Sequence, residues 1–360
     1  MKFKYIIGII LAVVVVVAIV WATNAPDNDK EIKIGVVAPL TGGGAAFGQS
    51  LVKGAELAMK EIKDTKHTYK LVVEDDGGSA ATAASAASKL INTDHVKAIL
   101  TVTGITGNAV KPIAEAAHVL HIADTADTSV GSGEYNFTNS ILPTDEMPGW
   151  LTEAAAHGTK KLAVLYQTHP GIMPTVGLLK KLAPQYGIEV VSFEGFEGSQ
   201  RDFKTIALKA KQTGADTYFV ASYPPALDIV SKDLMTLGIT NISTYALFAI
   251  SPTPEIYNGK WYTDANLADP SFMDQFKSAY PEIRFNVRTA PYGFDMVKMT
   301  VDAFEKSSDA HEYMKMLTSY DGKVGKVTKQ VGGHNFRSAP AVWTIENGIP
   351  KVVKVLQISE

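Results

Sequence analysis

The residues best placed to do chemistry form a glycine-rich turn, Gly42, Gly43, Gly44 and Gly48, in the segment IKIGVVAPLTGGGAAFGQSLVKGAELAM. Backbone N–H groups at the start of a helix lack intrahelical partners and attract anions. A dinucleotide-binding turn requires Gly-x-Gly-x-x-Gly, but Phe47 stands where the third glycine belongs, and no Lys-Ser/Thr pair follows as in a phosphate-binding loop. The turn therefore predicts a site for a small anionic or polar group and not for a nucleotide.

No other residue pattern supports catalysis. Glu74, Asp75 and Asp76 precede two glycines, which is typical of a turn with a helix cap, and the spacing supplies no further metal ligands. The histidines form no His-Glu-x-x-His motif, and the chain has no Gly-x-Ser-x-Gly elbow. Cysteine is absent, which excludes disulfides and cysteine nucleophiles. We expect no catalytic residue, no metal and no cofactor.

Composition limits the possible partners. The 360 residues suit two ordinary domains, and 46% hydrophobic residues suffice for sizeable cores. The net charge is -3, and Lys and Arg are spread along the chain without a basic cluster. Nucleic acid is therefore not an expected partner.

The N-terminus directs the chain to a membrane. Lys2 and Lys4 precede an uncharged run from Tyr5 to Ala25. Within it, Tyr5 to Ala22 is long for the hydrophobic region of a secretory signal and just long enough to span a bilayer. Residues 1–25 are thus predicted to be a signal peptide or a membrane anchor, and the polar residues 26–31 a tether. In either case the positive-inside rule places the rest of the chain outside the cytoplasm.

From Ile32 onward, apolar runs of strand length alternate with amphipathic stretches of helix length, as in parallel βαβ units. The expected strands are 32–40, 69–76, 96–103, 119–124, 161–166, 188–194, 215–222 and 243–249. The expected helices are 49–63, 79–91, 107–117, 174–186, 201–213, 226–237, 271–280, 292–306 and 310–319. A final hairpin over 341–357 turns at Asn347-Gly348. The sequence therefore predicts two similar α/β lobes.

Several stretches, taken in order, resemble a known family. IKIGVVAPLTGGGAAFGQSLVKGAELAMKEI, LVVEDDGGSAATAASAASKLI, KLAVLYQ, DFKTIALKAKQTGADTYFVASY and ENGIPKVVKV look like the type I periplasmic binding proteins. Within that family they are most similar to the leucine/isoleucine/valine-type receptors of ABC importers. The resemblance covers nearly all of Ile32 to Glu360. It implies a Venus flytrap of two doubly wound, Rossmann-like lobes that closes on a small ligand.

The resemblance also implies three crossovers between the lobes, at 140–145, 259–270 and 331–340. Residues 32–142 and 268–334 would then form lobe 1, and residues 143–267 and 335–360 lobe 2.

The expected function is that of a non-enzymatic extracytoplasmic receptor, which delivers a small amino-acid-like or carboxylate ligand to an ABC transporter permease. The ligand should bind beyond the carboxyl ends of the strands of both lobes. One alternative is a ligand-sensing receptor domain of a signalling system. A nucleotide-using enzyme is disfavoured by the broken glycine pattern.

The loops of lobe 1 supply the first candidate ligand-binding residues. The resemblance implies that the ring of Phe47 forms one wall of the ligand site. Alternatively, this ring could only pack its helix against the lobe. Small hydroxyl groups after the third strand suit a carboxylate, and a plain N-cap is a compatible role for Thr106. These candidates are Thr41, Phe47, Thr103, Gly104, Ile105 and Thr106.

Thr125, Ala126 and Asp127 follow the fourth strand. The resemblance implies a serine or threonine at position 127, whereas an aspartate repels a carboxylate and attracts an ammonium group. Asp127 could equally be a turn residue that bonds its own backbone. Leu247 falls near the place where branched-chain receptors carry an acid for the ligand's ammonium group. Either Asp127 replaces that acid or the ligand is not an α-amino acid.

The remaining candidates are His169, Tyr223 and Tyr292. The resemblance implies that Tyr223 contacts the ligand, although a tyrosine at a strand end is often part of the core. His169 is a weaker candidate, because a lone histidine in a loop is usually solvated. Tyr292 begins a predicted helix.

Overall fold

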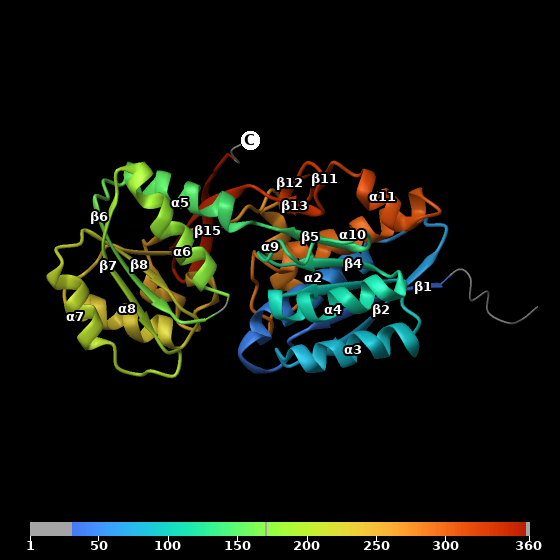
Figure 1. Cartoon of the computed structure of the whole chain (residues 1–360), viewed down its shortest axis with the longest axis horizontal. Coiled ribbons are helices and arrows are strands. Elements are labelled where there is room, and N and C mark those ends of the chain that lie inside the picture. The colour runs from blue at the N-terminus through green and yellow to red at the C-terminus, as the bar shows by residue number, and fades with distance from the viewer. Residues whose placement is uncertain (1–30, 170, 358–360) are drawn as a thin grey trace, which may run out of the picture.

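The computed structural model describes residues 31–169 and 171–357, which form two α/β lobes lying side by side (Figure 1). The signal peptide or anchor predicted at 1–25 lies outside the described residues. The tether was predicted to run to residue 31, but Glu31 already pairs with Thr68 in the first sheet. Among the described residues, no helix is long and apolar enough to cross a bilayer.

The sheet of the first lobe has the strand order β11-β12-β13-β5-β4-β3-β1-β2. Strands β1 to β5 and β13 pair in parallel, whereas β11 and β12 pair antiparallel with their neighbours. The bounds are β1 (Glu31–Ala38), β2 (Thr68–Asp75), β3 (Ala98–Val102), β4 (Leu120–Asp124), β5 (Asn136–Ser140), β11 (Ser319–Gly322), β12 (Gly325–Lys329) and β13 (Asn335–Arg337).

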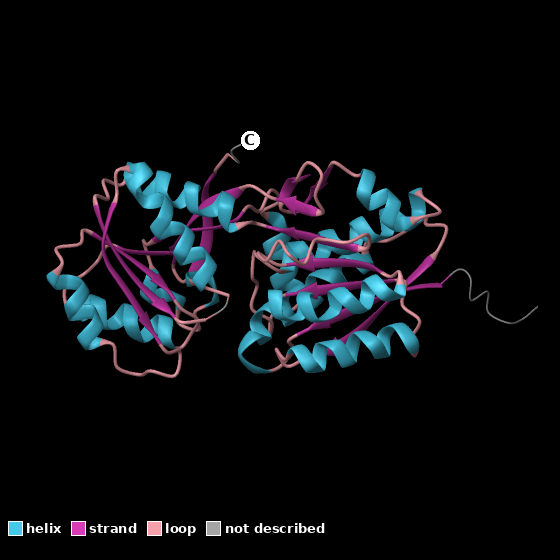
Figure 2. Ribbon diagram, viewed as in Figure 1, coloured by secondary structure: helices cyan, strands magenta, loops and turns pink. Residues whose placement is uncertain are grey.

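Helices cover both faces of this sheet (Figure 2), because successive side chains of a strand point to opposite faces. Val37 and Ile99 pack in one apolar cluster with α3 and α4, and Val36 and Leu100 pack in another with α2 and α10. The helices of the lobe are α2 (Ala45–Lys60), α3 (Ala80–Asn92), α4 (Gly104–Ala117), α9 (Ser271–Ala279), α10 (Ala290–Lys306) and α11 (Ala310–Met316).

Helices α2 and α10 approach each other closely because glycines stand at their contact. A Cβ atom on Gly54 would lie 1.8 Å from the carbonyl oxygen of Ala290, and one on Gly293 would lie 2.2 Å from that of Leu51. The contact ties the start of α10, and the residues just before it, firmly to the first lobe.

The sheet of the second lobe has the strand order β15-β14-β10-β9-β8-β6-β7. Its strands are β6 (Lys161–Gln167), β7 (Glu189–Phe196), β8 (Thr217–Ala221), β9 (Ile242–Tyr245), β10 (Trp261–Ala265), β14 (Pro340–Glu346) and β15 (Ile349–Val355). Its helices are α5 (Pro143–Ala156), α6 (Met173–Leu182), α7 (Lys204–Gln212) and α8 (Ala226–Thr236). The hairpin predicted to turn at Asn347-Gly348 is present as β14 and β15.

The chain passes between the two sheets three times: after β5, after β10 and after β13. The third passage lies within the predicted crossover 331–340, but the predicted lobe boundary, which gave residues 335–360 to the second lobe, comes a few residues too early. Strand β13 instead pairs with β5 of the first sheet, so the passage lies between Arg337 and Pro340. Strand β13 has only three residues, which is too short a run to give a recognisable strand pattern in the sequence.

The pattern-based prediction also missed several elements near the crossovers. Helix α5 contains Pro143 and Pro148, and prolines normally mark helix boundaries. Here Pro143 opens the first turn, where no N–H is needed, and Pro148 is tolerated further along. Strands β5, β10, β11, β12 and β13 are short and carry polar residues, so their periodicity is weak.

Candidate functional site

The loops after β1 and β2 lie together and are joined by one carboxylate. Asp75 Oδ1 accepts hydrogen bonds from the amides of Leu40 and Gly77, both at 2.8 Å, and Oδ2 accepts from the Thr41 hydroxyl at 2.7 Å. The hydroxyl of Thr41 and these amides lower the pKa of Asp75 below its usual value. Asp75 therefore shapes the glycine-rich turn, in agreement with the turn role expected of the acidic run.

The loop after β3 leads directly into α4. Thr103 has a φ of +76° and caps the helix by accepting from the Thr106 amide at 3.4 Å. The Thr106 hydroxyl is buried and donates to Asp76 Oδ2 at 2.5 Å. Gly104 lies against the next loop, because a Cβ atom there would be 3.2 Å from Asp127 Cβ. The side chain of Ile105 is 43% exposed.

The loop after β4 holds Thr125, Ala126 and Asp127. The Thr125 hydroxyl accepts from the Asp127 amide at 3.1 Å, and Ala126 is exposed. Asp127 Oδ1 accepts from the Ser129 amide and hydroxyl at 3.0 and 2.7 Å, and Oδ2 accepts from Asn108 Nδ2 at 2.7 Å. Partial burial opposes ionisation, but these hydrogen bonds outweigh it and lower the pKa of Asp127. This is the geometry of the turn alternative, and ligand contact by Asp127 stays a prediction.

In the second lobe, His169 and Tyr223 meet beyond the ends of β6 and β8. Their rings are edge to face at 5.1 Å, and His169 Nδ1 accepts from the Gly171 amide at 3.0 Å. The side-chain oxygen of Gln167 accepts from the Tyr223 amide at 3.1 Å, which fixes the loop. Burial lowers the pKa of His169 and raises that of Tyr223.

Two side chains that were predicted to contact the ligand touch each other across the boundary between the lobes. The rings of Phe47 on α2 and Tyr223 after β8 lie edge to face with centroids 6.2 Å apart. The turn that carries the broken glycine pattern therefore faces the strand ends of the opposite lobe.

The structure places Leu247 and Tyr292 in the interior. Leu247 is 2% exposed and packs in the main hydrophobic cluster. Tyr292 is fully buried, and its hydroxyl hydrogen-bonds the hydroxyl of Ser338. Burial raises the pKa of Tyr292 well above its usual value. Neither side chain lies with the exposed loop residues, and ligand contact by either stays a prediction.

A charged cluster that sequence reasoning missed lies where the lobes join. Arg288, just before α10, forms an ion pair with Glu146 of α5 at 2.8 Å and another with Asp264 of β10 at 3.1 Å. Asp124, the last residue of β4, is close enough for the charges of Arg288 and Asp264 to act on it. Burial raises the pKa of Asp124 to about 8 and that of Glu146 to about 7, against the opposing effect of Arg288, and it also raises the pKa of Asp264.

A second ion pair bridges the lobes nearby. Arg337 of β13 donates from Nε to Asp145 Oδ2 at 2.9 Å, and Asp145 stands beside Glu146 in the first turn of α5. In both pairs the cation comes from the first lobe and the carboxylate from the second.

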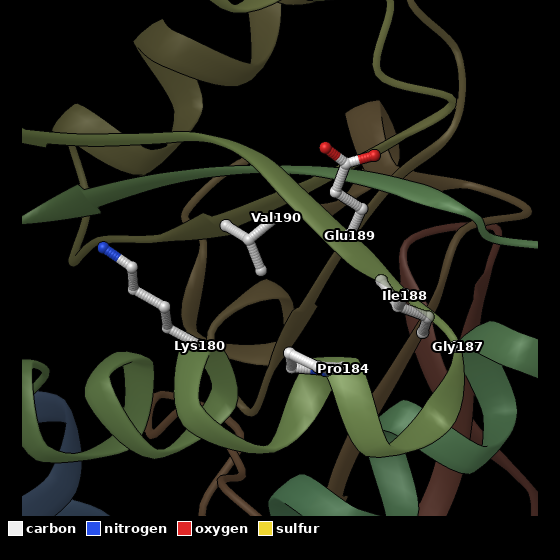
Figure 3. Close-up of a pocket in the computed structure, with 6 residues that line it drawn as sticks. All are labelled: Lys180, Pro184, Gly187, Ile188, Glu189 and Val190. Carbon is white, nitrogen blue, oxygen red and sulfur yellow. The ribbon is translucent and has the colours of Figure 1, made fainter.

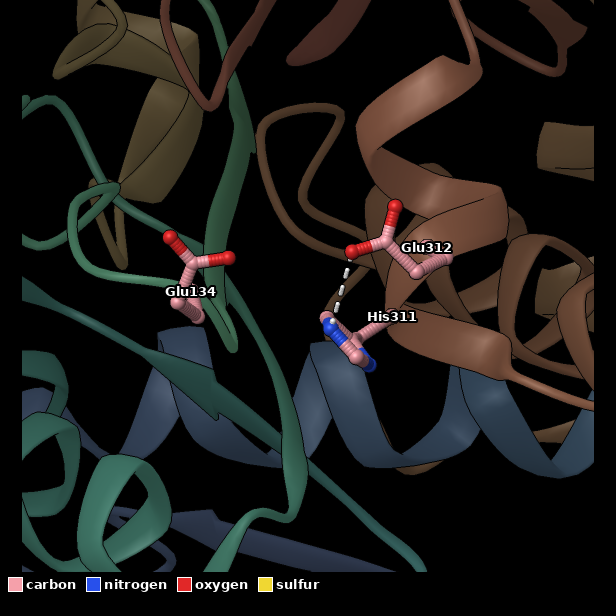
Figure 4. Close-up of side chains that lie close together, drawn as sticks. All are labelled: Glu134, His311 and Glu312. Atoms are coloured by element: carbon pink, nitrogen blue, oxygen red, sulfur yellow. Dashed lines mark ion pairs between the residues drawn. The ribbon is translucent and has the colours of Figure 1, made fainter.

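Two features elsewhere do not join this site. A shallow depression in the second lobe is lined by Lys180, Pro184, Gly187, Ile188, Glu189 and Val190 (Figure 3). Glu134, His311 and Glu312 lie close together at the far end of the first lobe (Figure 4). Lys315 already contacts Glu134 at 2.6 Å and Glu312 at 3.1 Å, so an ammonium group fills the place that a cation would take.

Only one signal in the sequence could have indicated the missed cluster. Asp124 ends a run of apolar residues, and a carboxylate at the buried end of a strand is unusual. Arg288, Glu146 and Asp264 lie far apart in the chain and belong to no motif. Their proximity results from the crossovers.

The comparisons with known proteins agree with this architecture. A family model described as periplasmic binding protein matches residues 31–339. The Leu/Ile/Val-binding protein homolog 3 of Brucella melitensis biotype 1 is 25% identical over an alignment 320 residues long, and the match covers 81% of this chain and 84% of that protein.

Two solved structures show the same fold. One is the branched-chain amino acid transporter substrate binding protein LivJ of Streptococcus pneumoniae in complex with isoleucine. It has a TM-score of 0.79, is 21% identical, and is matched over 90% of this chain and 100% of its own. The other is an ABC transporter solute binding protein of R. palustris in complex with 4-hydroxybenzoate. It has a TM-score of 0.80, is 18% identical, and is matched over 92% of this chain and 98% of its own.

Proposed function

The chain belongs to the periplasmic binding protein family, and on that premise we propose that it is the solute receptor of an ABC importer. In this role it binds a small organic ligand between its lobes outside the cytoplasm and presents the closed form to a permease. Hinge closure of two domains around a ligand provides the shape change that a partner can recognise.

One observation carries the proposal: the contact between Phe47 and Tyr223 across the lobe boundary. Each residue follows a strand of its own parallel sheet, and ligands of such sheets bind beyond the carboxyl ends of the strands. An aromatic pair that closes the boundary can cover an apolar ligand between the lobes.

The start of α4 is the proposed receptor for an acidic group of the ligand. The fourteen-residue helix begins at Gly104 after its cap Thr103, and the amides at the start of a helix have no intrahelical partner. Ile105 exposes an apolar side chain beside them. Thr41, Thr125, Ala126 and His169 are proposed to contribute from the adjoining loops of the two lobes.

The proposed ligand class has a carboxylate and an apolar portion. Relatives with this fold include one solved with isoleucine and one solved with 4-hydroxybenzoate, and both compounds combine these two features. The site offers helix amides for the first feature and Phe47, Tyr223 and Ile105 for the second. We further propose that residues 1–25 target the receptor to the membrane, as a cleaved signal or as an anchor.

A binding screen tests the proposal. The purified full-length protein, kept in mild detergent, would be heated with amino acids, small carboxylates and amides, and separately with NAD and ATP. A one-site ligand at a hundredfold excess over its dissociation constant should stabilise the protein by about 2.7 kcal/mol. Stabilisation by NAD or ATP alone would refute the receptor function.

A further inference from the structure

The guanidinium group of Arg288 joins the two lobes, although its backbone belongs to the first lobe. The Asn286 amide donates to Ser50 Oγ on α2 at 3.0 Å, which fixes this segment to the first lobe. Arg288 Nη2 donates to both carboxylate oxygens of Glu146, at 2.8 and 3.0 Å, and Nε lies 3.1 Å from Asp264 Oδ1. Both acids belong to the second lobe, so a rotation of that lobe relative to the first must break these contacts or move the arginine side chain.

Asp124 is an acid of the first lobe on which the charge of Arg288 also acts. It ends β4 and is 4% exposed. Its Oδ1 accepts from Ser140 Oγ at 2.9 Å, whereas its Oδ2 has no hydrogen-bond donor among the described residues. A buried carboxyl oxygen without a donor is costly, so Asp124 gains stability if an N–H group of Arg288 reaches it.

One cation therefore serves acids of both lobes. A guanidinium group has five N–H donors in a planar fork and can pair with a carboxylate through two of them. The side chain of Arg288 is only 15% exposed, and a charge that is buried without a partner is strongly destabilising. When Glu146 and Asp264 move away with the second lobe, Asp124 is the acid that stays with Arg288 in the first.

We propose that Arg288 is a two-position switch whose partner depends on the relative orientation of the lobes. In the described arrangement it pairs with Glu146 and Asp264. When the second lobe rotates away, which we call the separated arrangement, the arginine side chain moves to Asp124 and donates to its Oδ2. The inference rests on the proposed receptor function in that the lobes move, but it requires no particular ligand.

The switch gives two acids of one cluster opposite effects on the lobes. Glu146 stabilises the described arrangement, because it holds Arg288 only while the lobes are together. Asp124 stabilises the separated arrangement, because it holds Arg288 after Glu146 has moved away. Repulsion among the carboxylates alone predicts a different result, in which neutralising either acid shifts the lobes in the same direction. A receptor that opens and closes needs two arrangements of similar free energy, and this exchange of partners provides them.

Single-molecule fluorescence energy transfer tests the inference, because the chain has no cysteine and accepts a designed pair of labels. Ser85→Cys on α3 and Thr205→Cys on α7 place one exposed label on each lobe (Figure 1). Energy transfer between the dyes is measured on the ligand-free full-length protein in detergent. The measurement gives the ratio of molecules in the separated arrangement to molecules at the label distance of the described arrangement.

Neutral variants of the acids should shift this ratio in opposite directions. Glu146→Gln should raise it at least about tenfold, because truncating one partner of a buried charge pair is costly. Adding Asp124→Asn to that variant should lower the ratio again at least about tenfold. Adding Asp127→Asn instead should leave it unchanged, because the oxygens of Asp127 already accept hydrogen bonds from neighbouring residues. Melting temperatures check folding, and Asp264→Asn takes the place of Glu146→Gln if the latter does not fold.

Three other results would overturn the inference. An unchanged ratio in Glu146→Gln would show that its pair with Arg288 does not hold the lobes together. A further rise on adding Asp124→Asn would show that the acids act by repulsion. No response to Asp124→Asn would show that Arg288 does not move to Asp124. Because the measurement uses no ligand, each of these results leaves the receptor function standing, and the binding screen decides that function separately.

Discussion

Raising the pH should destabilise the ligand-free protein through Asp124. Burial raises the pKa of this carboxyl group to about 8, so the folded state keeps a proton that the unfolded state has already lost. Stability therefore falls as pH rises between the unfolded and the folded pKa. The slope is about 1.4 kcal/mol per pH unit, which gives a loss of about 2 kcal/mol from about pH 6.5 to about pH 8.

Other groups in this window do not obscure the effect. Glu146 and Asp295, whose pKa values burial raises to about 7, contribute in the same direction. Buried His121, with its pKa lowered to about 4, acts in the opposite direction but mainly below the ordinary histidine value of about 6.5. The slope in this window therefore sums several buried carboxyl groups, and the part that belongs to Asp124 is the part that a variant of Asp124 removes.

Urea denaturation followed by circular dichroism at several pH values measures this slope. Asp124→Asn cannot ionise and should reduce the slope by the share of Asp124, whereas Asp127→Asn, three residues further along the chain, should leave it unchanged because the pKa of Asp127 is already low. A slope that persists unchanged in Asp124→Asn would refute the reasoning.

Three further substitutions should have distinct effects. Tyr223→Ala removes one of the two aromatic walls and should weaken ligand binding at least about tenfold in calorimetry. Gly54→Ala places a Cβ atom 1.8 Å from the Ala290 carbonyl oxygen and should cost about 3 kcal/mol or more in urea denaturation. Arg337→Met leaves the buried Asp145 carboxylate without its cation and should cost about 3 kcal/mol in the same assay.

Each of these three predictions would be contradicted by a specific outcome. Unchanged affinity in Tyr223→Ala would make this ring part of the core only. Wild-type stability in Gly54→Ala would mean that α2 and α10 can separate without loss. For Arg337→Met, the double variant with Asp145→Asn should recover part of the stability, and a further loss would contradict the ion-pair explanation.

The sequence predicted those parts of the fold that depend on local patterns. Parallel strands such as β3 read as continuous apolar runs because both faces are buried, and the Asn347-Gly348 turn indicates its hairpin directly. Helix α5 was missed because its two prolines imitate a boundary. The short strands β11, β12 and β13 are defined by their partners and not by their own periodicity.

The residues of the candidate site also fall into two groups, those that a local pattern indicates and those that no local pattern indicates. Phe47 and Tyr223 could be selected because each follows a recognisable strand, and the structure brings them into contact. The cluster of Arg288, Glu146 and Asp264 could not be selected. Its members lie on three segments that meet only after the chain has crossed between the lobes, and no local spacing records that proximity.

The third passage between the sheets has a consequence for secretion. Strand β10 pairs with β14, and Trp343 donates to the Ala265 carbonyl oxygen at 3.0 Å, so the second sheet needs residues 340–355 beside β10 to be complete. A chain that emerges from a translocation channel N-terminus first therefore exposes the open edge of β10 until these residues arrive. We expect protease resistance of the second lobe to appear late, and pulse proteolysis of stalled chains ending before residue 340 would measure it.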